Sequence, residues 1–183
     1  MTPPLLERAD TVLVVVDLQS RLLSHIPGAE AVVDRAVRLV RAARVLDLPI
    51  LWTEQEKLGP TDPRVVEALP GIEPIRKLDF GCFGCDAFSP ALRATGRGTL
   101  LLVGIEAHIC VAQTALQALQ ADYGVHVAAD AVASRDPLHR DLALRRIEAA
   151  GGVVTCWESA LYELLERAGT EEFRACLPLV KGA

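Results

Sequence analysis

The sequence predicts a three-layer α/β fold, in which helices cover both faces of a doubly wound, mostly parallel sheet of six strands. Short apolar segments rich in β-branched residues recur along the chain, as expected of strands that are buried on both faces. Amphipathic helical segments alternate with them, which is typical of a parallel sheet with crossover helices. The chain has 183 residues, of which 51% are hydrophobic, so we expect a single domain, residues 1–183, with one full-sized core.

Two of the predicted strands flank the first helix. Residues 12–16 are almost wholly apolar and β-branched, and residues 50–53 are short, apolar and strand-like. Between them, residues 31–46 have apolar side chains at helical spacing, and Pro49 ends that helix. Residues 54–73 are rich in glycine and proline, which predicts a long connection with one helical turn inside it.

The alternation continues to the end of the chain. Residues 99–105 form the second strongly apolar strand, and a tight turn leads from it into a helix over residues 108–120. The pair Asp136-Pro137 caps another helix, which stops at Gly151. The other expected elements are strands at residues 75–77, 125–129 and 153–156, a helix that starts at Ser89-Pro90, and a last helix that ends at Gly169.

Composition and charge exclude several classes of protein. The net charge is -5 and no run of Lys or Arg could form a phosphate-binding stripe, so nucleic acid is not an expected partner. The longest apolar runs, at residues 12–16 and 100–103, are far too short to cross a membrane, and residues 1–10 have no signal-peptide pattern. Five cysteines, an odd number, fit reduced thiols better than a disulfide framework. We therefore expect a cytoplasmic protein that does not bind a membrane.

The predicted fold places a ligand site where the strand order reverses. In the order 3-2-1-4-5-6 this point lies at the carboxyl ends of strands one and four. Asp17 ends strand one, and Cys110 lies near the start of the helix after strand four. A helix N-terminus favours thiolate over thiol and can present amides to an oxyanion, so Cys110 is a candidate nucleophile. An inert core cysteine is the alternative interpretation.

Lys77 is the third candidate. It ends the short segment 75–77, which reaches the same edge of the sheet if it pairs beside strand two. A lysine there could hold Asp17 and favour the thiolate of Cys110. A solvated surface lysine is the alternative interpretation.

Several motifs together resemble a known family. VVVDLQ at residues 14–19, KLDFGCF at 77–83 and LLVGIEAHICV at 101–111 are similar to the isochorismatase-like cysteine hydrolase superfamily. This resemblance spans nearly the whole chain. The motifs that narrow it to the isochorismatase domain-containing branch are WTEQ at 52–55, LGPT at 58–61 and VHVAADAVASR at 125–135.

The resemblance implies a catalytic triad. It implies Asp17 as the general acid/base, Lys77 as the electrostatic partner and Cys110 as the nucleophile. It also implies a cis peptide bond between Ile105 and Glu106, just before the catalytic turn. Such a bond would serve to aim backbone amides at the substrate oxygen.

Further residues are expected around these three. The backbone amides of Ala107 and Cys110 are the expected oxyanion donors. From their positions, Gln19 and Gln55 are candidates for polar lining of the pocket. The other candidates for pocket lining are Phe80, Phe83 and His108.

The sequence predicts neither a metal nor a cofactor. The nicotinamidase branch of the family holds a divalent metal with an aspartate and histidines after strand two, but no histidine lies between His25 and His108. Nicotinamide is therefore a poor substrate candidate. The glycines of Gly96-Arg97-Gly98 precede a strand instead of following one, so they do not form a dinucleotide-binding fingerprint.

The expected function is metal-independent hydrolysis of a small amide or related carbonyl compound through a thioester on Cys110. Two alternatives stay open. One is a catalytically silent interaction protein on the same fold, and the other is a redox dithiol protein that uses the CxxC pair Cys82 and Cys85. The family likeness also implies a homo-oligomer.

Overall fold

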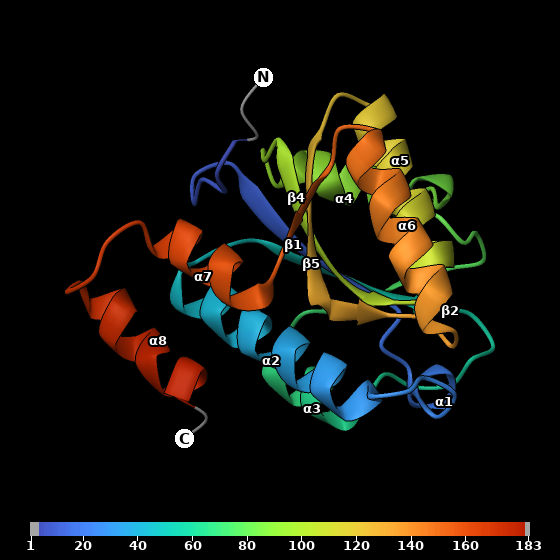
Figure 1. Ribbon diagram of the computed structural model, residues 1–183, viewed down its shortest axis with the longest axis horizontal. Coiled ribbons are helices and arrows are strands. Elements are labelled where there is room, and N and C mark those ends of the chain that lie inside the picture. Colours follow the sequence, from blue (N-terminus) through green and yellow to red (C-terminus); the bar gives the residue numbers. More distant parts are fainter. Residues whose placement is uncertain (1–3, 182–183) are drawn as a thin grey trace.

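Six parallel strands form the middle layer of the protein, in the order β3-β2-β1-β4-β5-β6. The computed structural model describes residues 4–181 (Figure 1). The strand order and the parallel pairing confirm the predicted doubly wound α/β fold. The strands are β1 (Thr11–Val16), β2 (Ile50–Gln55), β3 (Ile75–Lys77), β4 (Thr99–Ile105), β5 (Gly124–Ala133) and β6 (Val153–Thr155).

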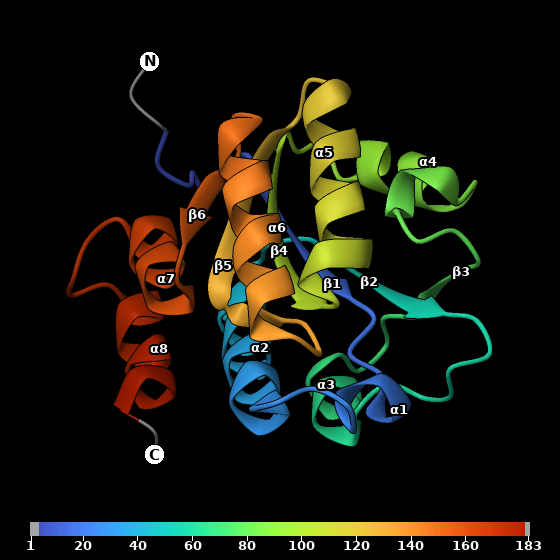
Figure 2. The same cartoon turned by 45° about the vertical axis from the view of Figure 1, so that its right-hand side comes forward.

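Helices cover both faces of the sheet, as Figures 1 and 2 show. Within residues 4–181, no helix is long and apolar enough to span a membrane. One face packs against α1 (Ser20–Leu23), α2 (Ala29–Val45), α3 (Pro63–Ala68), α7 (Trp157–Leu165) and α8 (Glu171–Lys181). The other face packs against a 3-10 turn, η1 (Cys82–Gly84), a π-helical turn, η2 (Ala107–Val111), and the helices α4 (Phe88–Ala94), α5 (Ala112–Gln120) and α6 (Pro137–Ala149).

The central strand β1 explains why the apolar pattern has no polar alternation. All six of its residues are buried. Val12, Val14 and Val16 face the helical layer of α4 to α6, and Leu13 and Val15 face the layer of α2. Each such side chain contributes about 1.5–3 kcal/mol when it is fully buried, so both faces of the strand must be apolar.

The structure corrects several predicted elements. β2 and β5 run further than their apolar segments, and the helix expected over residues 108–120 begins instead with the π-helical turn η2. The helix predicted to end at Gly169 ends at Leu165, and it is not the last one, because α8 follows it. Pro178 lies inside α8. Since proline usually breaks a helix, this residue concealed α8 in the sequence.

Gly104 brings β1 and β4 unusually close at the carboxyl edge of the sheet. It pairs with Val16 in the β1–β4 register. A Cβ atom added at Gly104 would lie 2.0 Å from the carbonyl oxygen of Val16, and the φ angle of Gly104 is +120°. Only glycine fits both conditions. Because Asp17 is the next residue after Val16, this contact fixes the chain where the candidate site begins.

Candidate active site

Asp17, Lys77 and Cys110 lie together at the carboxyl edge of the sheet. Asp17 directly follows β1, Lys77 is the last residue of β3, and Cys110 lies in η2, the turn after β4. Lys77 and Asp17 form an ion pair, and the charges of both act on the Cys110 thiol. Their exposed fractions are only 0% for Asp17, 1% for Lys77 and 6% for Cys110, so the cluster is almost wholly shielded from solvent.

The Lys77 ammonium is saturated with hydrogen-bond acceptors. Its Nζ lies 2.6 Å from Asp17 Oδ2 and 2.8 Å from Gln55 Oε1. It also donates to the backbone carbonyls of Asp79 at 3.2 Å and Phe80 at 3.1 Å. Burial is the largest single effect and would lower the pKa of Lys77, but the charge of Asp17, its hydrogen bond to Lys77 and the neighbouring Cys110 and Cys82 together outweigh burial, so the pKa is raised. Lys77 is therefore a permanent buried cation.

Asp17 is held at both carboxylate oxygens. Oδ2 accepts from Lys77, and Oδ1 accepts a hydrogen bond of 2.7 Å from the Thr53 hydroxyl. The φ angle of Asp17 is +48°, a left-handed conformation in which the chain turns sharply after β1. This turn places the carboxylate at the end of the sheet.

The Cys110 thiol is protonated at neutral pH. Burial raises the pKa of Cys110, the charge of Asp17 raises it further, and Lys77 opposes them only in part, so the pKa rises to about 12. Lys77 therefore lowers the pKa of Cys110, as expected from the sequence, but burial and the charge of Asp17 together have the larger effect and keep the thiol protonated. Cys110 needs a base before it can act as a nucleophile, and Asp17 is the carboxylate within hydrogen-bonding reach of its thiol.

The turn that carries Cys110 begins with a cis peptide bond between Ile105 and Glu106. The Glu106 carbonyl accepts a hydrogen bond of 3.0 Å from the amide of Ile109. The amide of Ala107 has no hydrogen-bond acceptor among residues 4–181. A donor without a partner in this turn is suited to bind an oxygen atom of a ligand.

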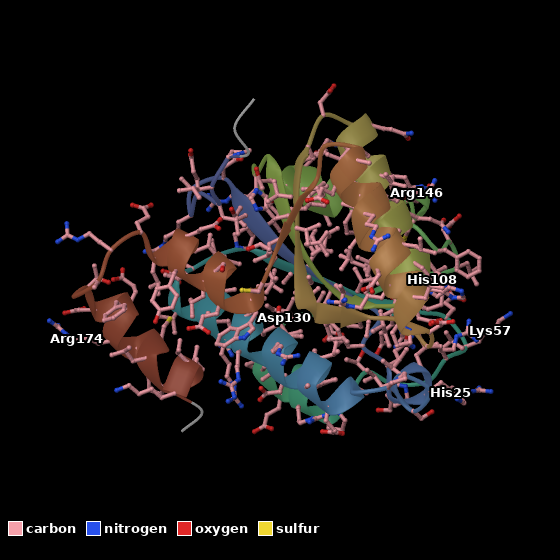
Figure 3. All side chains as sticks on the ribbon, viewed as in Figure 1. His25, Lys57, His108, Asp130, Arg146 and Arg174 are labelled. Atoms are coloured by element: carbon pink, nitrogen blue, oxygen red, sulfur yellow. The ribbon has the colours of Figure 1, made fainter. Side chains whose placement is uncertain are left out.

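Two side chains of the same turn are tied to the connection between β5 and α6. Glu106 accepts from the amide of Arg135 at 2.9 Å and from its Nε at 3.1 Å. His108 Nδ1 lies 2.9 Å from the Ser134 hydroxyl, and its ring packs 4.9 Å from that of His139. Burial lowers the pKa of His108, so its ring is neutral at pH 7. His108 (Figure 3) lines a separate small cavity of about 230 Å³ against α6.

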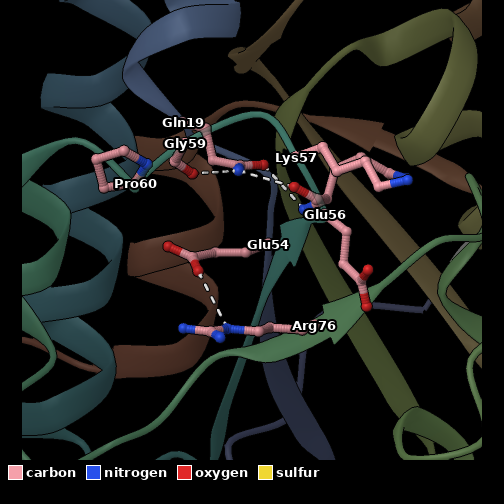
Figure 4. A pocket seen from close by; sticks show the side chains of 8 residues that line it. Gln19, Glu54, Glu56, Lys57, Gly59, Pro60 and Arg76 are labelled. Atoms are coloured by element: carbon pink, nitrogen blue, oxygen red, sulfur yellow. Dashed lines mark hydrogen bonds and ion pairs between the residues drawn. The ribbon is translucent and has the colours of Figure 1, made fainter.

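Gln19 and Gln55 line a cavity of about 610 Å³ at the ends of β2 and β3 (Figure 4), but their polar groups are already used. Gln19 Oε1 accepts from the amide of Gln55, and Gln19 Nε2 donates to the carbonyls of Gln55 and Gly59. Gln55 Oε1 accepts from Lys77, and its Nε2 donates to the Leu78 carbonyl. Both glutamines therefore fix neighbouring strands and loops. None of the triad residues lines this cavity.

The two phenylalanines of the loop after β3 differ in burial and in what they contact. Phe80 is 56% exposed, and its carbonyl accepts a hydrogen bond from Lys77. The ring of Phe83 packs 5.3 Å from that of Phe88 and 6.0 Å from that of Tyr123. Phe83 therefore anchors the loop to the helical layer.

The CxxC pair does not form a disulfide, and all five cysteines are free. Cys82 is buried, and this burial raises its pKa to about 11, next to Lys77 and Asp17. Cys85 Sγ lies 3.5 Å from the carbonyl of Arg76. Within the described residues, no group of three or more His, Cys, Asp or Glu side chains is arranged to hold a metal ion.

Two threonines in the cluster were not predicted. Thr53, in β2, donates to Asp17, as described above. Thr114, in α5, donates to the Cys110 carbonyl at 2.7 Å and accepts from the Cys82 amide at 3.0 Å. A hydroxyl at a buried position of an apolar strand or helix face is the sequence signal that could have identified both.

Comparison with known proteins identifies relatives over almost the whole chain. The isochorismatase domain model matches residues 11–159. The isochorismatase domain-containing protein 2A of the mouse, Mus musculus, is 35% identical over 178 residues, which cover 93% of this chain and 82% of the mouse protein. Both findings agree with the motifs seen in the sequence.

Solved structures are similar over the same extent. The MAR1 ribonuclease of Caenorhabditis elegans has a TM-score of 0.90 and 32% identity, covering 97% of this chain and 93% of that chain. YcaC of Pseudomonas aeruginosa, solved with hexane-2,5-diol and covalent acrylamide, has a TM-score of 0.91 and 29% identity, covering 98% and 93%. The Escherichia coli YcaC gene product, described as an octameric hydrolase of unknown specificity, has a TM-score of 0.91 and 23% identity, covering 98% of this chain and 92% of that chain. At this level of identity the likeness shows the fold alone. With its hydrolase fold and its matching domain, the chain belongs to the isochorismatase domain family.

Proposed function

We propose that the protein is a cysteine hydrolase that cleaves a small amide or related carbonyl compound and needs no metal. The observation that carries this proposal is the buried Asp17–Lys77 ion pair beside the protonated thiol of Cys110. A protonated thiol with a fixed carboxylate next to it is an arrangement for nucleophilic catalysis with a general base.

In the proposed reaction Asp17 takes the thiol proton of Cys110, and the thiolate forms a bond to the substrate carbonyl carbon. The amides of Ala107 and Cys110 bind the resulting oxyanion. When the carbonyl re-forms, the C–N bond breaks and Asp17 returns the proton to the leaving amine. Asp17 then deprotonates a water molecule that attacks the thioester, which releases the acid and restores the thiol.

Lys77 remains charged throughout this cycle. While Asp17 is ionised, Lys77 balances its charge in a buried site, where an unpaired carboxylate would be strongly disfavoured. When Asp17 carries the proton, the same ammonium stabilises the thiolate of Cys110. Lys77 therefore balances the negative charge whether it lies on Asp17 or on Cys110.

The relative from P. aeruginosa was solved with covalent acrylamide. Acrylamide alkylates nucleophiles such as thiols at its vinyl carbon, so this adduct supports a reactive nucleophile on this fold and leaves the substrate class to be tested. The proposal is tested with a panel of small aliphatic and aromatic amides, and intact-mass spectrometry to detect an acyl adduct. We expect turnover and an adduct with the wild type, neither with Cys110→Ala, and both with Cys176→Ala, which removes a buried thiol in α8. Turnover that persists in Cys110→Ala, or no turnover and no adduct across the panel, would contradict the proposal, and the second outcome would favour a silent interaction protein.

RNA is the control substrate, because one relative is named a ribonuclease. We expect no cleavage of RNA, since the net charge is -5 and the sequence has no basic stripe for a phosphate backbone. RNA cleavage that Cys110→Ala abolishes would replace the proposed substrate class.

We also propose a cytoplasmic homo-oligomer. The free state of all five cysteines supports a reducing compartment. An octameric relative with the same fold supports self-association, as do Leu138 and Leu142, which α6 exposes to solvent. Light scattering after size-exclusion chromatography tests the assembly, and a monomer at micromolar concentration would contradict it.

A further inference from the structure

Thr53 is a buried threonine next to the Asp17–Lys77 ion pair. Thr53 lies in β2 and is only 1% exposed. It is on the same side of the strand as Leu51, which packs against the core cluster of α4 to α6. Valine has the same shape and an even better preference for strands, so a threonine at this position needs a use for its hydroxyl. Its hydroxyl donates to Asp17 Oδ1 at 2.7 Å, and it also lies beside the buried thiol of Cys82.

This contact completes the hold on the carboxylate. Lys77 binds Oδ2 at 2.6 Å from the β3 side, and Thr53 binds Oδ1 from β2. A carboxylate held at one oxygen can still rotate about its last side-chain bond, whereas donors at both oxygens fix its plane. The plane decides which lone pair faces the Cys110 thiol, and proton transfer requires that geometry.

We propose that Thr53 is a positioning residue that orients Asp17 for proton transfer from Cys110. This inference rests on the proposed function, in which Asp17 is the base and Cys110 the nucleophile. The proposal also explains why two donors point at this carboxylate. An ionised carboxylate can only accept hydrogen bonds, and here Thr53 supplies a neutral donor and Lys77 a charged one.

The test measures how fast iodoacetamide alkylates Cys110 in the full chain, by peptide mapping between pH 6 and 8. In the wild type we expect a rate that changes little with pH, because Asp17 removes the proton within the site. Thr53→Val should slow the reaction at pH 7 about tenfold or more, which is the value of one hydrogen bond to a charged group. Its rate should then rise about tenfold per pH unit, because alkylation must wait for the free thiolate.

Two further variants separate positioning from folding. Thr53→Ser keeps the hydroxyl and should restore the wild-type rate within about threefold. Thr11→Val makes the same change at another buried strand threonine, whose hydroxyl donates to the Glu7 carbonyl at the opposite end of β1 from Asp17, and it should leave the rate unchanged. Loosening of the whole fold would instead increase the labelling of buried Cys176.

The outcomes distinguish this inference from the function it rests on. Cys110 labelled at the wild-type rate in Thr53→Val, with a flat pH profile, would overturn the role of Thr53 and leave the nucleophile intact. If Cys110 of the wild type reacts no faster than the other cysteines and its rate follows pH, then Asp17 is not its base and the proposed function fails as well.

Discussion

Lys77 Nζ lies 2.6 Å from Asp17 Oδ2, and neither side chain is exposed to solvent. Removing one partner of a buried ion pair leaves the other charge uncompensated, so Lys77→Met should lower the free energy of unfolding by about 3–5 kcal/mol. Urea denaturation measures this loss. Arg76→Ala, at a neighbouring side chain that is 74% exposed, is the matched control and should change stability by less than about 0.5 kcal/mol.

The double variant Asp17→Asn with Lys77→Met tests the coupling between these residues. Because it removes both charges, its loss of stability should be clearly smaller than the sum of the two single losses. Additive losses would mean that the two charges do not depend on each other.

Stability should fall at alkaline pH because of the buried thiols. The pKa values of Cys110 and Cys82 are raised in the folded protein, to about 12 and about 11. Above the ordinary thiol pKa the unfolded chain loses protons that the folded chain keeps, so the folded state loses about 1 kcal/mol per thiol between pH 9 and 10. The urea midpoint at pH 7, 9 and 10 measures this trend. Cys110→Ala should make this trend shallower, and an equally steep trend in that variant would contradict the prediction.

Gly104→Ala should damage both the fold and the site. The added Cβ would meet the backbone of Val16, which cannot move without shifting Asp17, and the φ of +120° is unfavourable for alanine. We expect a loss of about 3 kcal/mol, measured by thermal unfolding, together with slower alkylation of Cys110. Gly96→Asn is the control, because that position has open space and a left-handed φ of +66° that asparagine tolerates. Equal effects of the two variants would show that the β1–β4 contact does not require glycine.

Hydrolysis should continue in the presence of a strong chelator. The connection after β2 carries no histidine, and in the proposed reaction Cys110, Asp17 and Lys77 supply nucleophile, base and countercharge from the chain itself. Initial rates before and after dialysis against EDTA measure this. A loss of activity that zinc or iron restores would mean that a metal takes part.

The sequence predicts the strands more reliably than the chemistry of the site. β1 and β4 are apolar on both faces, so their pattern survives any detail of packing, and the positions of Asp17 and Cys110 follow from where these strands end. α8 is hidden because Pro178 contradicts a helix locally, while the buried Cys176 helps hold it against the core. Local sequence does not contain that tertiary contact.

Side-chain roles were harder to predict for a related reason. Gln19 and Gln55 were expected from their positions to line the pocket, yet their amides bind other parts of the protein. The direction of the Cys110 pKa depends on how far burial outweighs Lys77, which no spacing reveals. Thr53 fits the β-strand preference of its segment so well that its hydroxyl draws no notice.

The short strand β3 has a consequence for how the protein loses activity. It pairs only with β2, through three residues at the edge of the sheet, and the last of these is Lys77. Edge segments with few hydrogen bonds open by local fluctuation more easily than a central strand such as β1. If β3 detaches, Lys77 leaves Asp17 while the remaining strands stay paired. Local opening of β3 and global unfolding of the sheet are thus separate events. Amide hydrogen exchange of β3 reports the local opening that separates Lys77 from Asp17, and amide hydrogen exchange of β1 reports global unfolding.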